Sequence, residues 1–354
     1  MVLPRYDMLR NLLRTQCHER GIHIQNNSLF VFGSNTDVGK TLVSAGILKF
    51  KPSSRQGLYM KPIQTGETYD AQFIHRNCQQ QNLVVRTLYH WEIAASPHVA
   101  ARASPNIPDD AEVIMRIKAE MESFLRQSHQ TATMVLIETA GGALSPGPSG
   151  NLQASMYHQL RLPVVLVGDS RLGGISATIA AYEALFTRAY QIPVIAMIDT
   201  VDGLSDRYGN AAFLLEYFQK LHAKSKTSLT ETPLVFRLTP IPSDKSLPLQ
   251  DWFYENQPTF TEMNSYIDSF VFGYSQRLLQ MHHQGMHQVW WPFTQHQNVS
   301  QNDVTLIESA QKDDFLTISS FEHEYQISEL YYINGLATKS MFDACASWWT
   351  QVNF

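Results

Sequence analysis

The sequence predicts an α/β fold with a doubly wound, mostly parallel sheet, and three observations lead to this prediction. Apolar runs recur along the chain with helical patterns between them. Most of these runs are continuous rather than alternating, as in parallel strands that helices cover on both faces. Strand and helix alternate, which is typical of sheets that bind ligands beyond the carboxyl ends of their strands.

The expected strands and helices follow one another along the chain. A first strand begins at Leu29, and later apolar runs predict strands within 58–62, 134–142, 162–170, 192–200 and 233–242. Helical spacing predicts a helix directly after the first strand and further helices within 111–128, 173–190 and 210–223. A long amphipathic segment, 260–283, closes the domain, and 283–288 is expected to be a linker.

The chain divides into three regions in this interpretation. Residues 27–285 form the α/β domain, and residues 1–26 form an extension in which arginines alternate with apolar residues. The extension is either an amphipathic organelle-targeting segment or an extra helix packed on the domain. Residues 286–354 contain too few regular elements to close a core alone, so they are interpreted as the short, incomplete beginning of a second domain.

The composition excludes several classes of function. Hydrophobic residues make up 44% and charged residues 17% of the 354 residues, which predicts a packed core. A net charge of −5 provides no basic surface for nucleic acid, and the apolar runs are too short to span a membrane. Cys17, Cys78 and Cys345 are widely spaced, so they form no metal pattern and indicate a reducing compartment, either mitochondrial or cytoplasmic.

The stretch "LFVFGSNTDVGKTLVSAGIL" (29–48) predicts a strand, a tight loop and a helix that together bind phosphate. Gly39, Lys40 and Thr41 stand where the loop becomes a helix, whose N-terminus attracts anions. Glycine lets the backbone approach the phosphates, lysine adds charge, and the threonine hydroxyl ligates the magnesium of a nucleotide. The loop is a variant Walker A motif, in which Ser34 replaces the first glycine and Gly33 stands one residue earlier. The alternative is a plain strand–helix connection with a solvated lysine.

Further polar residues stand at the ends of later strands. "MKPIQTG" contains Lys61 and Thr65, and the lysine can reach the pocket of Lys40. Two lysines near one triphosphate suit phosphoryl transfer, because that reaction depends on positioning and charge stabilisation. The alternative is a lysine that faces solvent at a strand end.

Two acidic residues complete a predicted magnesium site with Thr41. Glu138 ends an apolar strand in "IETAGG", and Asp70 begins a helix in "YDAQF". A carboxylate buried by a strand must be paired or bound to metal, and magnesium takes oxygen ligands. The alternatives are a structural ion pair for Glu138 and an N-cap role for Asp70.

Two glycine-containing loops lie near the same strand ends. "SRLGGISAT" (170–178) opens a helix at Gly174, Ile175 and Ser176, which provides a further anion-binding terminus. "GGALSPGPSG" (141–150) either borders the site or is a mobile surface loop.

Five separated motifs together resemble dethiobiotin synthetase. They are "GSNTDVGKT", "KPIQTG", "ETAGG", "VGDSRLGGIS" and "TPIP", and the resemblance runs from about Leu29 to the 280s. "SPGPSGNLQASMY" resembles the form found in eukaryotic bifunctional biotin-synthesis proteins, in which diaminopelargonate aminotransferase follows the synthetase. "WWPFTQH" and "DACASWW" resemble the first segments of that class III aminotransferase.

The resemblance implies a P-loop NTPase-like fold and a reaction that closes the ureido ring of dethiobiotin. Its substrates are ATP with magnesium, carbon dioxide and 7,8-diaminononanoate, and its expected state is a homodimer. By resemblance, the residues that wrap the phosphates are Gly33, Ser34, Asn35, Thr36, Asp37, Val38, Gly39, Lys40 and Thr41. The other implied roles are catalysis by Lys40, Lys61 and Thr36, metal binding by Thr41, Asp70 and Glu138, and adenine binding by Pro240 and Ile241. Thr65, Ser145 and Pro146 border the diamine, and Gly174 and Ile175 of the partner subunit receive its carboxylate.

The sequence also departs from the family pattern and leaves other functions open. Asp37 stands where many family members have glutamate, and "MIDTVDG" (197–203) lacks the asparagine that reads adenine in many bacterial members. A pyridoxal phosphate aldimine is not expected, because only Lys312 and Lys339 follow the linker and both lie in the opening segment. The alternative functions are a cobyrinate-type amide synthetase and a non-enzymatic ATP-binding scaffold for a fused aminotransferase. No N-K-x-D motif of a regulatory GTPase occurs.

Overall fold

The computed structural model describes residues 26–67, 69–78, 82–128, 132–200, 209–224, 232–242, 249–290 and 316–317. Contacts between residues divide the chain into one unit of residues 18–271 and another of residues 1–17 and 272–354. Of the second unit, the structure describes the end of a long helix and one parallel pair, β8 (Val289–Trp290) with β9 (Leu316–Thr317). The predictions for residues 1–25, and for Lys312 and Lys339, lie outside the described residues.

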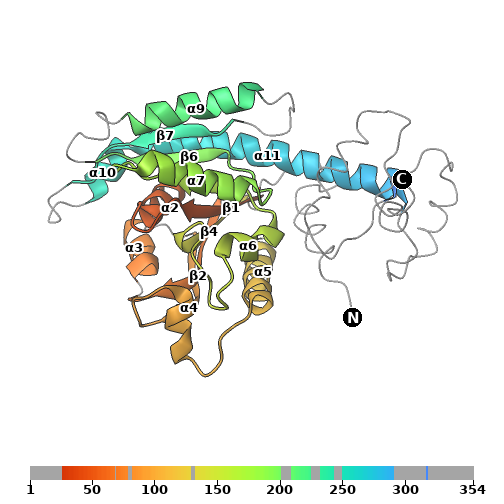
Figure 1. Cartoon of the computed structure of the whole chain (residues 1–354), viewed down its shortest axis with the longest axis horizontal. Coiled ribbons are helices and arrows are strands. Elements are labelled where there is room, and N and C mark those ends of the chain that lie inside the picture. The colour runs from red at the N-terminus through yellow and green to blue at the C-terminus, as the bar shows by residue number, and fades with distance from the viewer. Residues whose placement is uncertain are drawn as a thin grey trace. The chain divides into compact units, whose positions relative to one another are not determined.

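The first unit is built on a seven-stranded parallel sheet with strand order β3-β2-β4-β1-β5-β6-β7 (Figure 1). From β1 the chain moves toward one edge through β2 and β3. It then crosses back through β4 to reach β5, β6 and β7 on the other side. This order confirms the predicted doubly wound sheet. The strands are β1 (Asn26–Gly33), β2 (Gln56–Thr65), β3 (Leu83–Trp91), β4 (Thr133–Gly142), β5 (Val164–Val167), β6 (Val194–Ile198) and β7 (Leu234–Leu238).

Helices cover both faces of the sheet. One layer contains α2 (Lys40–Lys49), α3 (Tyr69–Asn77), α10 (Leu249–Glu255) and α11 (Gln257–Gln288). The other layer contains α5 (Asp110–Gln127), α6 (Gln153–Tyr157), α7 (Gly174–Phe186) and α9 (Asn210–Lys224). Three short elements, α4 (Pro97–Ala100), η1 (Ala101–Ala103) and η2 (His158–Leu160), lie in the connections. This arrangement follows from right-handed crossovers, which put the helices on opposite faces when the chain changes direction.

Each face of the sheet is covered by closely packed side chains. Phe30 lies 5.3 Å from Tyr157 of α6, measured between ring centroids, and Phe32 lies 5.7 Å from Tyr190. On the other side, the ring of Phe260 in α11 lies against Gly46 of α2, where a Cβ atom would come within 2.0 Å of the ring. Strands buried on both faces need apolar residues at every position, which explains the continuous runs in the sequence.

A buried cluster with a charge pair lies at the amino ends of the strands. It consists of Arg55, Asp268 and Asn27, and we call it the amino-end cluster. The guanidinium of Arg55, directly before β2, donates to both carboxylate oxygens of Asp268 at 2.6 and 3.1 Å. Asn27 of β1 donates its amide to the same carboxylate. This bidentate arrangement fastens α11 to the start of the sheet.

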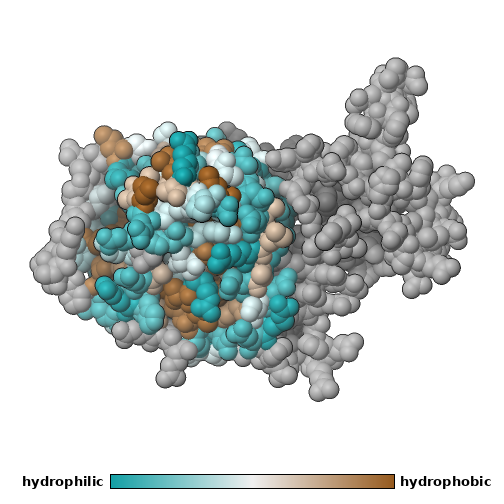
Figure 2. Space-filling view, turned by 90° about the horizontal axis from the view of Figure 1, so that it is seen from below, coloured by the Kyte–Doolittle hydropathy of each residue, from teal (hydrophilic) through white to brown (hydrophobic). Residues whose placement is uncertain are grey.

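The structure differs from the sequence prediction at two places. Strand β3 was not predicted, because its sequence "LVVRTLYHW" at the sheet edge mixes polar and apolar residues and is only partly buried. Residues 283–288, the expected linker, are the last residues of helix α11. No helix among the described residues is long and apolar enough to cross a membrane. Hydrophilic residues cover much of the face in Figure 2, with small hydrophobic groups between them.

Candidate functional site

The predicted phosphate loop joins β1 to α2, as the sequence indicated. Gly39 is the N-cap of α2 and has a φ of 93°, a left-handed conformation that favours glycine. A Cβ atom at Gly39 would lie 2.4 Å from Cδ1 of Ile198 at the end of β6, so a side chain there is excluded on two grounds. Glycine at this position therefore lets the loop turn directly into the helix N-terminus, the kind of site that binds anions.

Lys40, the first residue of α2, bends back over this loop. Its side chain is buried, and Nζ lies 3.5 Å from the carbonyl oxygen of Asn35. Burial, and next the charge of Lys61, lower the pKa of Lys40 to about 8. Among the described residues no carboxylate lies in hydrogen-bond range of this ammonium group, so it is poised to meet an anion.

The side chain of Glu138 in β4 is fully buried, and four hydrogen-bond donors surround its carboxylate. Oε1 accepts hydrogen bonds from Thr41 Oγ1 and Lys61 Nζ, both at 2.8 Å. Oε2 accepts hydrogen bonds from Ser44 Oγ at 2.8 Å and Tyr59 OH at 3.0 Å. Burial, and next the charge of Glu138, raise the pKa of Tyr59, so this hydroxyl stays a neutral donor.

Asp70 joins the same cluster from the first turn of α3. Lys61 Nζ lies 2.7 Å from Asp70 Oδ2, and the Thr41 hydroxyl, whose one proton points to Glu138, lies within reach of Asp70 Oδ1 at 3.1 Å. Burial alone would lower the pKa of Lys61, but Glu138 and Asp70 outweigh it and raise that pKa. The alternative role of Asp70 as an N-cap is wrong, because α3 already begins at Tyr69. We call Lys61, Glu138, Asp70, Thr41, Ser44 and Tyr59 the carboxyl-end cluster.

The donors in this cluster fit magnesium, which prefers carboxylate, hydroxyl, phosphate and water oxygens. Thr41, Asp70 and Glu138, the predicted ligands, are brought together within hydrogen-bond distance. In the described part of the chain, no three His, Cys, Asp or Glu side chains are grouped to hold a metal. The structural ion pair of Glu138 with Lys61, the alternative from sequence, is present as well.

The loop after β4 is fixed by internal hydrogen bonds. Ser145 Oγ accepts a hydrogen bond from the Gly142 amide at 2.9 Å, and Pro146 forms an isolated bridge with Leu152. A Cβ atom at Gly141 would come within 2.4 Å of Ser145 Oγ and 3.8 Å of Thr36 Oγ1. The predicted substrate residue Ser145 and the phosphate-loop residue Thr36 therefore flank the same glycine.

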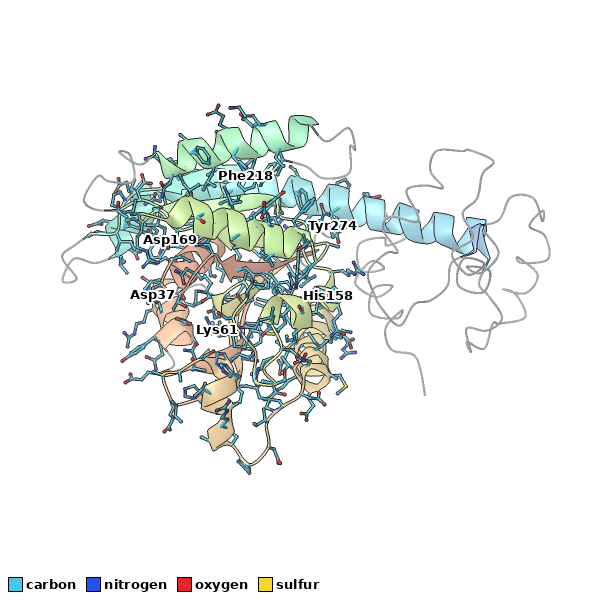
Figure 3. All side chains as sticks on the ribbon, in the orientation of Figure 1. Asp37, Lys61, His158, Asp169, Phe218 and Tyr274 are labelled. Atoms are coloured by element: carbon cyan, nitrogen blue, oxygen red, sulfur yellow. The ribbon has the colours of Figure 1, made fainter. Side chains whose placement is uncertain are left out.

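The remaining predicted residues lie at strand ends on this side of the sheet. Gly174 and Ile175 begin α7, which confirms the helix start expected there. Thr65 ends β2, and Pro240 and Ile241 follow β7. Figure 3 shows Asp37, Lys61 and Asp169 toward this end of the sheet and His158 toward the other.

Sequence reasoning missed Ser44 and Tyr59, although a local signal exists for each. Ser44 stands three residues after Thr41 on α2, and residues at this spacing share a helix face. Tyr59 stands two residues before Lys61 on β2, and residues at this spacing share a sheet face. Both periodicities point to the carboxylate that Thr41 and Lys61 contact.

Comparison with known proteins places this chain in a family. A family model described as an AAA domain matches residues 27–229. An ATP-dependent dethiobiotin synthetase of Lysinibacillus sphaericus is 31% identical over 237 residues, which cover 59% of this chain and 95% of that protein. The chain belongs to the dethiobiotin synthetase family. This membership confirms the resemblance seen in the motifs.

Longer relatives contain a dethiobiotin synthetase fused to an aminotransferase. A bifunctional dethiobiotin synthetase/7,8-diamino-pelargonic acid aminotransferase of rice, named as mitochondrial, is 34% identical over 378 residues. That alignment covers 91% of this chain and 42% of the rice protein. A bifunctional relative of Emericella nidulans is 33% identical, with coverage of 91% and 39%. This member of the dethiobiotin synthetase family thus spans about two fifths of those relatives' length.

Proposed function

We propose that this chain closes the ureido ring of dethiobiotin from 7,8-diaminononanoate and carbon dioxide, with ATP and magnesium. One observation carries the proposal. Lys40 at the phosphate loop and Lys61 on β2 come together at the carboxyl ends of the strands, where Thr41, Asp70 and Glu138 also lie. A nucleotide-binding scaffold needs the phosphate loop, but it has no need of a second buried lysine between two carboxylates.

The proposed reaction has three steps. One amine of the substrate attacks carbon dioxide to form a carbamate and releases a proton. A carbamate oxygen then attacks the γ-phosphorus of ATP, and ADP leaves. Finally, the second amine attacks the carbonyl carbon, so that the ring closes and phosphate leaves with the loss of a proton.

The chain's own residues stabilise charge in these steps. Loop amides from Gly33 to Thr41 bind the phosphates, Lys40 meets charge on the transferred phosphoryl group, and Thr36 reaches the γ-phosphate end. Lys61 is already protonated between Glu138 and Asp70, so it can turn from these carboxylates to the carbamate. Thr41, Asp70 and Glu138 are the residues that would hold magnesium, which supplies further positive charge at the phosphates when bound.

The other roles also rest on family membership. Thr65, Ser145 and Pro146 border the diamine, and the start of α7 at Gly174 and Ile175 of the partner subunit receives its carboxylate. Pro240 and Ile241 border the adenine. The proposed assembly is a homodimer, and the "mitochondrial" in the rice protein's name makes that organelle the compartment to test first.

The test follows carbon from carbon dioxide into the product. The purified chain is incubated with ATP, magnesium, 7,8-diaminononanoate and ¹³C-bicarbonate, and dethiobiotin is measured by mass spectrometry. We expect one ¹³C atom per dethiobiotin and one ADP per ring. ATP hydrolysis that ignores the diamine, with no labelled product, would contradict the proposal and favour a scaffold role.

A further inference from the structure

The loop that joins β4 to α6, residues 143–152, folds back on itself. Pro146 forms an antiparallel bridge with Leu152, and the Gly147 amide donates to the Asn151 carbonyl at 2.7 Å. The Gly150 amide donates to the Gly147 carbonyl at 3.1 Å, and Gly150 has a φ of 92°. The loop therefore closes in a tight turn, with glycine at the left-handed position.

The base of this loop is fixed to the sheet. The side chain of Gln153, the first residue of α6, is fully buried, and its Nε2 donates to the Ala140 carbonyl at 2.7 Å. Its Oε1 accepts a hydrogen bond from the Ala140 amide at 3.1 Å. The Gln153 amide donates to the Ser145 carbonyl at 3.0 Å, and the Ala143 amide donates to the Gly33 carbonyl at 2.9 Å. Strands β4 and β1 thus hold both ends of the loop.

The tip of the loop, residues 147–151, is held by a carboxylate of another element. Asp110 lies in the first turn of α5, and its Oδ1 accepts a hydrogen bond from Ser149 Oγ at 2.6 Å. Its Oδ2 accepts one from Asn151 Nδ2 at 2.8 Å, and Ser149 Oγ accepts one from the Asn151 amide at 3.2 Å. Bonds to an ionised acceptor are stronger than bonds between neutral groups, and a helix N-terminus stabilises that charge. One carboxylate therefore uses both its oxygens to anchor the tip.

We propose that Asp110 is a positioning residue for the diamine, because it holds the loop that carries Ser145 and Pro146 in its closed form. The inference rests on the proposed function, which places the diamine beside these two residues. Pro146 pairs with Leu152 where the base meets the tip, so release of the tip also weakens this pairing. A ligand that binds the closed loop has its apparent affinity reduced in proportion to the fraction of closed chains. Loss of Asp110 should therefore weaken diamine binding and leave the chemistry of the closed form unchanged.

The experiment measures steady-state kinetics of Asp110→Ala, with labelled dethiobiotin as the product that is counted. We expect KM for the diamine to rise about 3- to 10-fold, the size expected when hydrogen bonds to a charged group are lost. Both kcat and KM for ATP should change by less than about 2-fold, because chains with a closed loop react normally. Asp110→Asn is the conservative variant. Its amide can accept from Asn151 and donate to Ser149 Oγ, so it should restore KM for the diamine.

Glu112→Ala is the matched control, because Glu112 lies in the same first turn of α5. Its Oε2 accepts a hydrogen bond from the Asp109 amide at 3.1 Å, within the capping box of the helix. Each variant removes one carboxylate from the start of α5, but Glu112 bonds to the helix start and Asp110 bonds to the loop. Glu112→Ala should therefore leave KM for the diamine unchanged. Hydrogen exchange without ligand should be faster over residues 146–152 in Asp110→Ala and unchanged there in Glu112→Ala.

A second variant removes the two donors and keeps the carboxylate. Ser149→Ala combined with Asn151→Ala changes two exposed side chains, so it provides the same test if Asp110→Ala does not fold. It should raise KM for the diamine as Asp110→Ala does. When all three substitutions are combined, KM should rise no further, because residues that act through one set of hydrogen bonds are not additive.

The outcomes are distinct. An unchanged KM for the diamine in folded Asp110→Ala overturns the inference, as does a loss confined to kcat or an equal rise in Glu112→Ala. A further rise of KM in the combined variant also overturns it, because Asp110 would then act by another route. If the unmodified chain forms no labelled dethiobiotin, the proposed function fails, and the diamine as the ligand of this loop fails with it. An active chain whose KM ignores Asp110 refutes the role of Asp110 alone.

Discussion

The two ends of the sheet each bury an ion pair. The two pairs differ in how completely the hydrogen-bonding groups of the cation and the carboxylate match one another. In the amino-end cluster, Arg55 and Asp268 match in shape, with two hydrogen bonds between one guanidinium and one carboxylate. In the carboxyl-end cluster, Lys61 is a single ammonium group shared by Glu138 and Asp70. In the first arrangement the guanidinium and the carboxylate use each other's hydrogen-bonding groups, so few remain for a ligand. In the second, two carboxylates share one cation, so a second cation can still bind them.

The difference shows that burial of a charge pair does not by itself mark a functional site. The carboxyl-end cluster draws on β2, α3, β4 and the helix after the phosphate loop, so it lies where parallel strands open toward a ligand. The amino-end cluster joins two strand starts to α11. The following predictions test whether the first cluster acts in catalysis and the second in stability.

Lys40→Ala should have the largest effect, and it should appear in turnover. Lys40 is expected to meet charge that develops on the transferred phosphoryl group, and loss of one such contact typically lowers turnover by about 10²–10³-fold. The melting temperature should stay close to that of the unmodified chain, because burial disfavours the charge of Lys40. Lys220→Ala, which removes an exposed lysine on α9 paired with Glu216, is the control and should leave turnover unchanged. Near-normal turnover in folded Lys40→Ala would refute the assignment.

Asp268→Ala should instead affect stability. It removes the carboxylate that accepts hydrogen bonds from both Arg55 and Asn27, while the Arg55 side chain stays buried. Breaking a buried pair costs about 3–5 kcal/mol, and we expect about 2 kcal/mol here, since the Asp268 side chain is 23% exposed. Denaturant unfolding measures the loss. The magnesium concentration that gives half-maximal activity should not move in the folded fraction, and a clear shift would contradict the division between the two clusters.

Local sequence patterns predicted the carboxyl-end cluster well. Lys61 and Glu138 each stand at the end of an apolar run, Thr41 follows the phosphate loop, and parallel strands bring such positions together at their carboxyl ends. The amino-end cluster could not be predicted in this way, because Asn27 and Asp268 are 241 residues apart and neither belongs to a motif. Only packing of α11 on the sheet brings them together.

The edge strand β3 could not be predicted from sequence patterns either. A central strand such as β4 is buried over nearly its whole length, so its apolar run is diagnostic. Strand β3 has one neighbour, and Arg86, Thr87 and His90 interrupt its apolar residues.

Glu138→Gln should weaken the response to magnesium and also lower stability slightly. Glu138 and Asp70 do not face each other as two unpaired carboxylates, because Lys61 Nζ lies 2.8 and 2.7 Å from them. Removing the charge of Glu138 leaves Lys61 with one carboxylate, so a small loss in melting temperature is expected rather than a gain. The half-maximal magnesium concentration should rise about 10-fold or more, as is usual when a metal site is disturbed. A much lower melting temperature with an unchanged magnesium curve would make Glu138 a structural residue only.

Tyr59→Phe should have the smallest effect and gives the sharpest comparison, because a matched tyrosine exists elsewhere. Tyr59 OH donates to Glu138 Oε2 at 3.0 Å, and Tyr190 OH donates to the Ala154 carbonyl at 2.9 Å. Both side chains are buried, so each Phe substitution removes one buried hydrogen bond and should cost about 1 kcal/mol of stability.

The two variants should separate in their magnesium curves. Without Tyr59 OH, Oε2 of Glu138 keeps one of its two hydrogen-bond donors among the described residues, Ser44, so the carboxylate is held less firmly. Groups that orient a metal ligand affect metal affinity by about 10–100-fold, and one of two donors should account for the lower end of that range. Tyr190→Phe lies in the α6 layer, away from Glu138, and should leave the curve unchanged. Equal curves for both variants, at equal loss of stability, would mean that Tyr59 serves the fold alone and that Ser44 suffices to orient Glu138.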